Sequence, residues 1–214
     1  MVVIKWHRHA CFEIRGSKVT VVTDPHDGVS LGISPPSCKG DIVLVSHNHF
    51  DHNAVDVVSK PDTEVVSAFI GEKEVKGVYI KGIKTYHDKY GGRQRGENTV
   101  YLFIVDGIRF VHLGDLGHTL EDQHLKELGE VDILFIPVGG TFTIGAKEAV
   151  EIVEKLKPRI TIPMHYKIPG LGLPLSEVDK FTSRLKKIVE KPNEVSVTKE
   201  ELPEPTEIWV LAPK

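Results

Sequence analysis

The chain has 214 residues, of which 40% are hydrophobic and 27% are charged, and its net charge is −3. This length suits one sizeable domain or two small ones, and a slightly negative chain without a long basic block argues against a general nucleic-acid surface. Two cysteines, Cys11 and Cys38, do not make a disulfide framework, and no apolar run approaches the ~20 residues that span a bilayer. We therefore expect a cytoplasmic protein without a membrane partner.

The first half of the chain is typical of short strands separated by turns. Apolar and β-branched runs predict strands at 2–6, 11–15, 19–23, 42–46, 64–68, 78–80, 82–86, 98–105 and 108–112. Asp106-Gly107 between the last two is a signal for a two-residue hairpin turn. One short helix is predicted at 54–59, where Pro61 follows and stops it.

The second half alternates helices with strands. Helices are predicted at 120–128 and 147–157, and strands at 133–138, 159–164, 194–198 and 207–211. Ser176 and Asp179 resemble a capping box that opens a further helix, which runs to Glu190 with Phe181 and Leu185 turned inward. Mixed strands with amphipathic helices predict an α/β (α+β) layered sandwich, with two sheets inside and helices outside.

Four potential metal ligands follow the predicted strand at 42–46. Residues 46–52 read Ser-His-Asn-His-Phe-Asp-His, so His47, His49, Asp51 and His52 lie within six positions. Because alternate residues of an extended segment point the same way, His47 and His49 can converge on one point while Asp51 and His52 turn toward a second. A solvated histidine-rich loop is the alternative, but such a loop would not be expected to follow a buried strand.

Three further residues stand where later strands end, namely His87, Asp115 and His165. Gly114 precedes Asp115 and allows a sharp turn that can aim the carboxylate inward. Together with the first group this makes five imidazoles and two carboxylates, a donor set that suits zinc, manganese or iron. Because these residues extend from His47 to His165, we expect a single domain over residues 1–214.

These motifs resemble the metallo-β-lactamase fold superfamily, and within it the small metal-dependent hydrolases related to L-ascorbate-6-phosphate lactonase. Supporting segments are Trp6-His-Arg-His-Ala-Cys-Phe12, Thr23-Asp-Pro25, Arg95-Gly-Glu-Asn98 and Pro137-Val-Gly-Gly140. The resemblance implies a four-layer αββα sandwich and two divalent metal ions, with zinc first and manganese or iron as alternatives. It further implies that His47, His49 and His87 hold the first metal, that Asp51, His52 and His165 hold the second, and that Asp115 bridges them.

Several other residues have two interpretations each. The resemblance suggests that His9 faces the substrate or a ligand, although a hydrogen-bonded structural histidine fits equally well. Asp24 could orient a ligand imidazole or simply form a turn before Pro25. Arg93 and Arg95, in a glycine-rich loop, could grip phosphate or carboxylate or form a solvated basic loop.

The candidate residues fall into two sets besides the metal ligands. We assign Asp51, Asp115 and His9 as candidate catalytic residues, and Arg93, Arg95 and His118 as candidate substrate-binding residues. His118 enters this set because it lies three positions beyond Asp115, where it could line the cleft.

The sequence thus predicts a hydrolase that uses a metal-bridging hydroxide on a small, anionic ester, lactone or phosphodiester. The expected partner is a small-molecule substrate, and the sequence indicates neither its identity nor the oligomeric state. One alternative is a non-haem iron oxygenase or sulfur dioxygenase, because the same motifs can host iron. Another is a non-catalytic, metal-dependent binding or sensor module.

Overall fold

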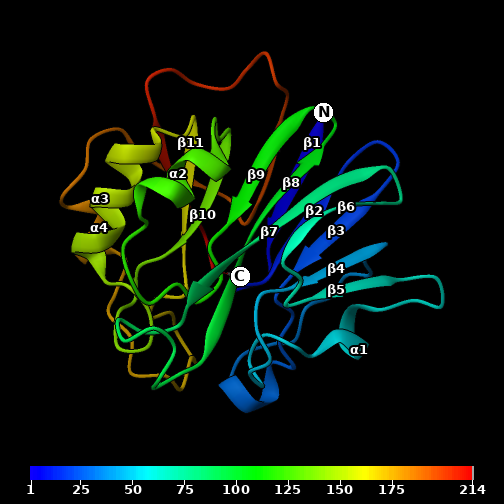
Figure 1. Cartoon of the computed structure of the whole chain (residues 1–214), viewed down its shortest axis with the longest axis horizontal. Helices are drawn as coiled ribbons and strands as arrows, with labels where there is room; N and C mark the ends of the chain where they lie inside the picture. The colour runs from blue at the N-terminus through cyan, green and yellow to red at the C-terminus, as the bar shows by residue number, and fades with distance from the viewer. Residues whose placement is uncertain (214) are drawn as a thin grey trace.

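Two β-sheets face each other at the centre of the computed structural model, which describes residues 1–213 (Figure 1). The six-stranded sheet has the order β13-β1-β2-β3-β4-β5, with β1 Val2–Trp6, β2 Phe12–Arg15, β3 Thr20–Thr23, β4 Ile42–Val45, β5 Glu64–Ser67 and β13 Glu194–Val197. The eight-stranded sheet has the order β12-β14-β11-β10-β9-β8-β7-β6, with β6 Gly71–Val75, β7 Val78–Tyr86, β8 Glu97–Val105, β9 Ile108–His112, β10 Ile133–Pro137, β11 Ile160–Met164, β12 Ile188–Lys191 and β14 Glu207–Leu211.

The helices lie outside the sheets. Beside β10 and β11 are α2 Asp122–Leu128, α3 Ala146–Leu156 and α4 Asp179–Thr182, whereas the single turn α1 Val55–Val58 lies beside β4 and β5 (Figure 1). A 3₁₀ turn, η1 Val29–Leu31, follows β3. The predicted α/β class with two inner sheets and outer helices is confirmed. Within residues 1–213, no helix is long and apolar enough to cross a membrane.

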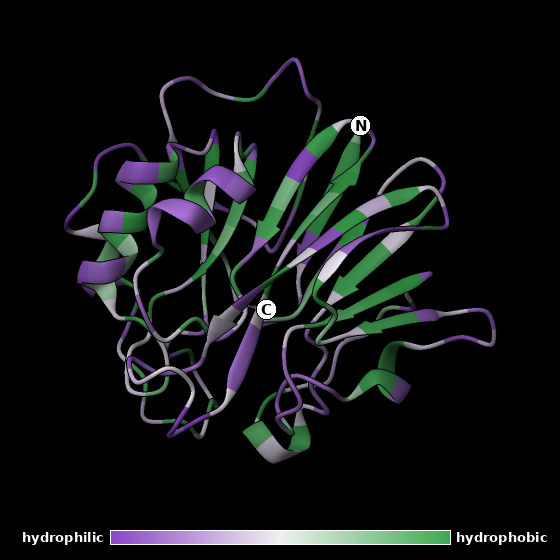
Figure 2. Ribbon diagram, in the orientation of Figure 1, coloured by the Kyte–Doolittle hydropathy of each residue, from purple (hydrophilic) through white to green (hydrophobic). Residues whose placement is uncertain are grey.

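The core follows the alternation of side chains along the strands. In β4, Ile42 and Leu44 join the cluster between the sheets, whereas Val43 and Val45 pack on the opposite face with Val58 of α1. This two-sided burial explains why β4 is hydrophobic along its length, while α2 and α3 carry both hydrophobic and hydrophilic residues (Figure 2). The sheets contact each other directly, for example where Phe12 stacks on Phe135 with ring centroids 4.1 Å apart.

The predicted helix ending at Glu190 is wrong. In its place α4 spans only Asp179–Thr182, its N-cap is Val178 without a side-chain bond, and residues 188–191 form strand β12. β12 pairs in parallel with β14, in a register that sets Val189 beside Trp209. Backbone hydrogen bonding at the edge of the sheet therefore overrides the helical spacing of the apolar residues.

Two differences concern the strands after Ile70. Strand β6 was not predicted, because at this sheet edge its residues are largely charged and exposed and show no apolar alternation. The predicted strands at 78–80 and 82–86 are one continuous strand, β7. Lys76 and Gly77, with φ of 48° and 78°, form the tight turn between β6 and β7.

Tyr101 of β8 ties the eight-stranded sheet to the strand that leads into the histidine motif. Its hydroxyl accepts a hydrogen bond from the Phe69 N–H at 3.0 Å and lies 3.2 Å from the carbonyl oxygens of Val45 and Val66. The ring itself is buried. The hydroxyl therefore joins β8 to the ends of β4 and β5.

We expect Tyr101→Phe to lower the free energy of unfolding by roughly 1–3 kcal/mol, because it removes the acceptor of the Phe69 N–H and the hydroxyl donor next to the Val45 and Val66 carbonyls. Chemical denaturation of the two proteins measures this difference. Tyr90→Phe is the control, since the Tyr90 side chain is exposed. A Tyr101 variant as stable as the Tyr90 variant would contradict this interpretation of the hydroxyl.

Candidate metal centre

Strand directions bring the predicted ligands to one place. β7 and β9 are each antiparallel to β8, and β9, β10 and β11 are parallel, so the carboxyl ends of β7, β9 and β11 share one edge. His87, Asp115 and His165 follow these ends. In the facing sheet β3 and β4 are parallel, so Asp24 and His47 also leave the same edge. Ligands from both sheets therefore meet at one rim of the sandwich.

The first group of ligand atoms belongs to His47, His49 and His87, which lie within 4.8 Å of one another. His47 Nε2 is 3.1 Å from His49 Nδ1, and the rings of His47 and His87 have centroids 4.8 Å apart. His47 and His87 are buried, whereas His49 reaches solvent. This is the set that the resemblance assigned to the first metal.

The second group consists of His9, Asp51, His52 and His165. It contains the three residues assigned to the second metal and adds His9, whose Nε2 lies 3.0 Å from Asp51 Oδ2. His52 Nε2 is 3.4 Å from the same carboxylate oxygen. The structure thus places His9 beside a predicted ligand, where its imidazole can hold Asp51, and its catalytic role stays a prediction.

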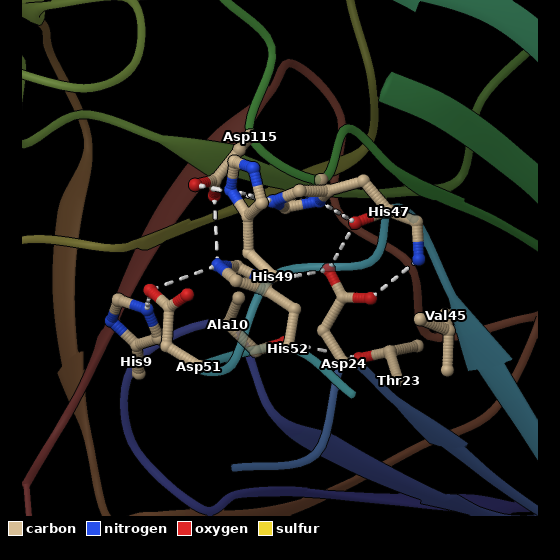
Figure 3. Close-up of polar contacts among 12 residues, drawn as sticks. His9, Ala10, Thr23, Asp24, Val45, His47, His49, Asp51, His52 and Asp115 are labelled. Atoms are coloured by element: carbon tan, nitrogen blue, oxygen red, sulfur yellow. Dashed lines mark hydrogen bonds and ion pairs between the residues drawn. The ribbon is translucent and has the colours of Figure 1, made fainter. Parts of the chain in front are cut away.

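Asp115 lies between the two groups (Figure 3). Its Oδ2 is 3.1 Å from His87 Nε2 in the first group and 3.3 Å from His165 Nε2 in the second. Its Oδ1 is 3.3 Å from His52 Nε2. A carboxylate offers two oxygens, so a residue in this position can contact ligands of both sites at once.

The donor set fits divalent metal ions. Burial, reinforced by neighbouring imidazoles, lowers the pKa of His9 and of His47 to about 3, so both rings are neutral and have a free lone pair. Burial alone would raise the pKa of Asp115, but His165 and His52 outweigh it and hold that pKa well below its usual value. Among residues 1–213, His52 Nε2 and Asp115 Oδ1 are buried without a hydrogen-bond partner, as expected of atoms that face a metal.

Asp24 orients ligands of both groups (Figure 3). Its Oδ2 accepts hydrogen bonds from His52 Nδ1 at 3.0 Å and from Ser46 Oγ at 2.6 Å, and Oδ1 accepts one from the Ser46 N–H at 2.7 Å. Ser46 Oγ in turn lies 2.9 Å from His47 Nδ1. These contacts leave Nε2 of His52 and of His47 directed at the metal positions. The sequence had left the role of Asp24 open, and it did not single out Ser46.

Asn98 fixes the backbone at Asp115. Its side-chain amide donates to Thr85 Oγ1 and to the Leu113 carbonyl, and its Oδ1 accepts the Asp115 N–H at 2.9 Å. Gly114, with φ of 56°, makes the turn that the sequence predicted there, and a Cβ at this position would lie 2.4 Å from Asn98 Oδ1. The Asp115 carboxylate is therefore aimed by a glycine turn and a buried amide.

Backbone strain concentrates at the same rim. His9, Asp24 and His165 are non-glycine residues with φ of 51°, 38° and 52°. Such conformations cost about 1–3 kcal/mol each and persist where surrounding contacts impose them. Here the His165 N–H donates to the His9 carbonyl at 3.2 Å, and Trp6 Nε1 donates to the same oxygen at 3.1 Å. These strained conformations lower the stability of the fold, and the surrounding hydrogen bonds hold the site residues in them.

A cavity of about 190 Å³ opens onto the ligands. It is lined by His49, Phe50, Asp51, His87, Arg95, Asp115, Phe142, His165 and Leu173. Of the predicted substrate-binding residues, only Arg95 faces this cavity. Arg93 is exposed and its Nε donates to the Tyr90 carbonyl. His118 Nε2 accepts the Tyr86 N–H and its Nδ1 lies 2.8 Å from the Thr119 carbonyl, so both ring nitrogens contact the backbone, and His118 does not line this cavity.

Two other places in the structure have some of the features of such a centre. His7, Glu13 and Cys38 also bring ligand atoms together, but Arg15 already pairs with Glu13 at 3.1 Å, and burial raises the pKa of the Cys38 thiol to about 12. A larger cavity of about 800 Å³, between residues 166–170 and strands β12 and β14, is lined by none of the clustered histidines. The chemistry therefore belongs to the smaller cavity.

Comparisons with known proteins place the chain in a family. Residues 3–165 match the family described as a β-lactamase superfamily domain. The chain is 31% identical to a UPF0173 metal-dependent hydrolase of Thermococcus onnurineus (strain NA1), over 91% of this chain and 99% of that protein, and 33% identical to one of Thermoplasma acidophilum, over 76% and 82%. A crystal structure from Thermotoga maritima, described as a candidate zinc-dependent hydrolase of the metallo-β-lactamase superfamily, has a TM-score of 0.83 and 36% identity over 99% of this chain and 98% of that chain.

The chain belongs to the metallo-β-lactamase superfamily, and within it to the UPF0173 metal-dependent hydrolases.

We expect Asp24→Asn to weaken metal binding by roughly ten- to a hundredfold, the usual effect of losing a carboxylate that orients ligand imidazoles. Titration of the metal-loaded protein with a chelator measures this affinity. Asp27→Asn is the matched control, because Asp27 is three positions away and its carboxylate bonds to Ser30. Equal metal affinity in the two variants would show that Asp24 has no orienting role.

Proposed function

We propose that the protein hydrolyses a small, anionic ester, lactone or phosphodiester with the help of two divalent metal ions. The observation that carries this proposal is the place of Asp115, whose two oxygens lie within 3.3 Å of imidazoles from both ligand groups. One tetrahedral metal would need only four ligands, whereas seven ligands are predicted here, Asp115 and six other residues.

The two ligand groups support the following roles. His47, His49 and His87 would hold the first ion, Asp51, His52 and His165 the second, and Asp115 both. Two bound ions would lower the pKa of a shared water so that it supplies a hydroxide nucleophile, and would polarise the oxygen of the bond under attack. His9 holds the carboxylate of Asp51, which fixes the negative charge next to the second ion position.

The walls of the cavity support a small substrate. Phe50, Phe142 and Leu173 line it together with the ligands and would exclude bulk water from a bound ester. Neutral imidazoles around few carboxylates leave a pair of divalent ions with net positive charge, which favours an anionic substrate. Zinc is our first choice because nitrogen and carboxylate donors suit it and because the description of the Thermotoga maritima relative names zinc. Manganese and iron are the alternatives.

We expect two ions per chain in the parent protein and a loss of hydrolysis by roughly a hundredfold or more in Asp115→Asn, because a ligand shared by both ions matters at least as much as the partners that orient ligands. The amide keeps the volume of the side chain but cannot bridge as an anion. Elemental analysis, hydrolysis of para-nitrophenyl esters and phosphodiesters, and thermal unfolding are measured together.

Asp62→Asn serves as the control, since the Asp62 carboxylate lies on the surface beside Lys60 and Lys76. A single tightly bound ion, without a second on titration, would overturn the dinuclear proposal. Near-parent turnover in Asp115→Asn would overturn the bridging role.

A further inference from the structure

Arg95 is a cation at the mouth of the metal site without an acidic partner. It lines the cavity beside His87, Asp115 and His165. Its Nη2 donates to the Thr141 carbonyl at 3.4 Å, and no carboxylate oxygen of residues 1–213 lies within 4.0 Å of its guanidinium. Arg15 and Arg159, by contrast, each pair with glutamates. A guanidinium directed at a catalytic cavity without a counter-ion is suited to an anion that arrives from solution.

The backbone of Arg95 is held in place by Asp88, the residue after the ligand His87. The Asp88 carboxylate accepts backbone N–H groups from Tyr90 at 2.7 Å, Gly92 at 3.1 Å, Gln94 at 2.9 Å and Arg95 at 2.8 Å. One carboxylate thus folds the loop of residues 88–96 around itself. Because this loop directly follows His87, the position of Arg95 is fixed relative to the predicted metal ligands.

The side chain of Arg95 rests on an aromatic ring. Its Cζ lies 4.9 Å from the ring centroid of Phe142, which belongs to the segment between β10 and α3. A guanidinium in contact with a ring through its face keeps the N–H groups at its planar edge for other partners. Those groups can form the paired hydrogen bonds that a carboxylate or a phosphate accepts.

The other side chains that line the cavity limit the size and polarity of the ligand. Phe50, which is 61% exposed, and Leu173 line the same cavity as Arg95. The cavity volume of about 190 Å³ compares with a cavity of about 150 Å³ that accommodates benzene in another protein. The space between the arginine and the metal ligands therefore suits a compact, apolar body about the size of one ring or a short alkyl chain.

We propose that Arg95, supported by Phe142, recognises an anionic group of the substrate that is separated from the scissile bond by a short apolar segment. This inference rests on the proposed hydrolase function and narrows it to esters or lactones that carry a second, non-reacting carboxylate or phosphate. Arg93 has no part in this recognition.

The test compares the metal-loaded parent with Arg95→Gln, Arg95→Lys and Arg93→Gln. The substrates are the para-nitrophenyl monoester of glutaric acid, which carries a free carboxylate, and para-nitrophenyl valerate, which has an acyl chain of equal length without it. We expect Arg95→Gln to raise KM for the glutarate ester by roughly ten- to a hundredfold, the size of one charge-assisted hydrogen bond, with kcat, metal content and KM for valerate unchanged. Arg95→Lys restores part of the loss, because it keeps the charge but not the paired donors.

Arg93→Gln is the matched control from the same loop and should behave as the parent. An unchanged KM for the glutarate ester in Arg95→Gln would overturn the proposal. An equal rise in Arg93→Gln would do the same, because it would show a general effect of loop charge.

A binding measurement tests anion recognition by Arg95 independently of the proposed hydrolysis. Calorimetric titration of the metal-loaded proteins with benzoate, phenyl phosphate and neutral benzamide does not depend on turnover. Weaker binding of benzoate or phenyl phosphate in Arg95→Gln, with benzamide binding unaffected, supports anion recognition. This holds even if the parent hydrolyses neither ester, because a lack of hydrolysis counts only against the proposed function. The anion that loses more affinity identifies carboxylate or phosphate as the preferred group. Equal binding of both anions by parent and Arg95→Gln would overturn the inference while leaving hydrolysis in place.

Discussion

The negative charge of three buried carboxylates, Asp24, Asp51 and Asp115, is the constraint around which the metal centre is arranged. A carboxylate loses hydration on burial, and only close donors or cations offset that loss. Asp24 meets this requirement with hydrogen bonds from Ser46 and His52. Asp115 Oδ1 has no hydrogen-bond partner in the described part of the chain, so its charge faces the space between the imidazoles. Divalent ions in that space would remove the electrostatic cost of burying the cluster.

The two sheets bring the strand ends that precede the site residues to one rim of the sandwich. Their strands were predictable wherever apolar residues alternate or fill both faces, as in β4 and β9, because burial determines that pattern. At the two edges of the eight-stranded sheet, however, the pattern fails. β6 is charged and β12 keeps helical spacing, so both depend on backbone pairing with β7 and β14, which a single sequence does not reveal. Neither strand contributes a predicted metal ligand, so both errors leave the grouping of those residues unaffected.

The clustered residues of the candidate site could be singled out because histidine and aspartate at strand ends are a local signal. What the sequence could not supply is the direction in which neighbouring side chains point. Arg93 and Arg95 look alike in the sequence, and only the folding of the 88–96 loop around Asp88 turns one toward the cavity and leaves the other in solvent. Phe50 and Phe142 were missed for a related reason, since an isolated aromatic residue in a loop carries no signal until its neighbours in space are known.

Chemistry and recognition rest on different parts of the structure. The ligands follow strands whose backbones are locked into the sheets, and Asp24 and Asn98 hold them from within the core. Arg95 and Phe142 lie instead on connecting segments, which meet beside the cavity where Arg95 contacts the Phe142 ring and the Thr141 carbonyl. A change in these segments can therefore alter which anion is bound without moving a metal ligand. A change at Asp24, by contrast, reaches His52 directly and His47 through Ser46, and so acts on both groups of predicted ligands.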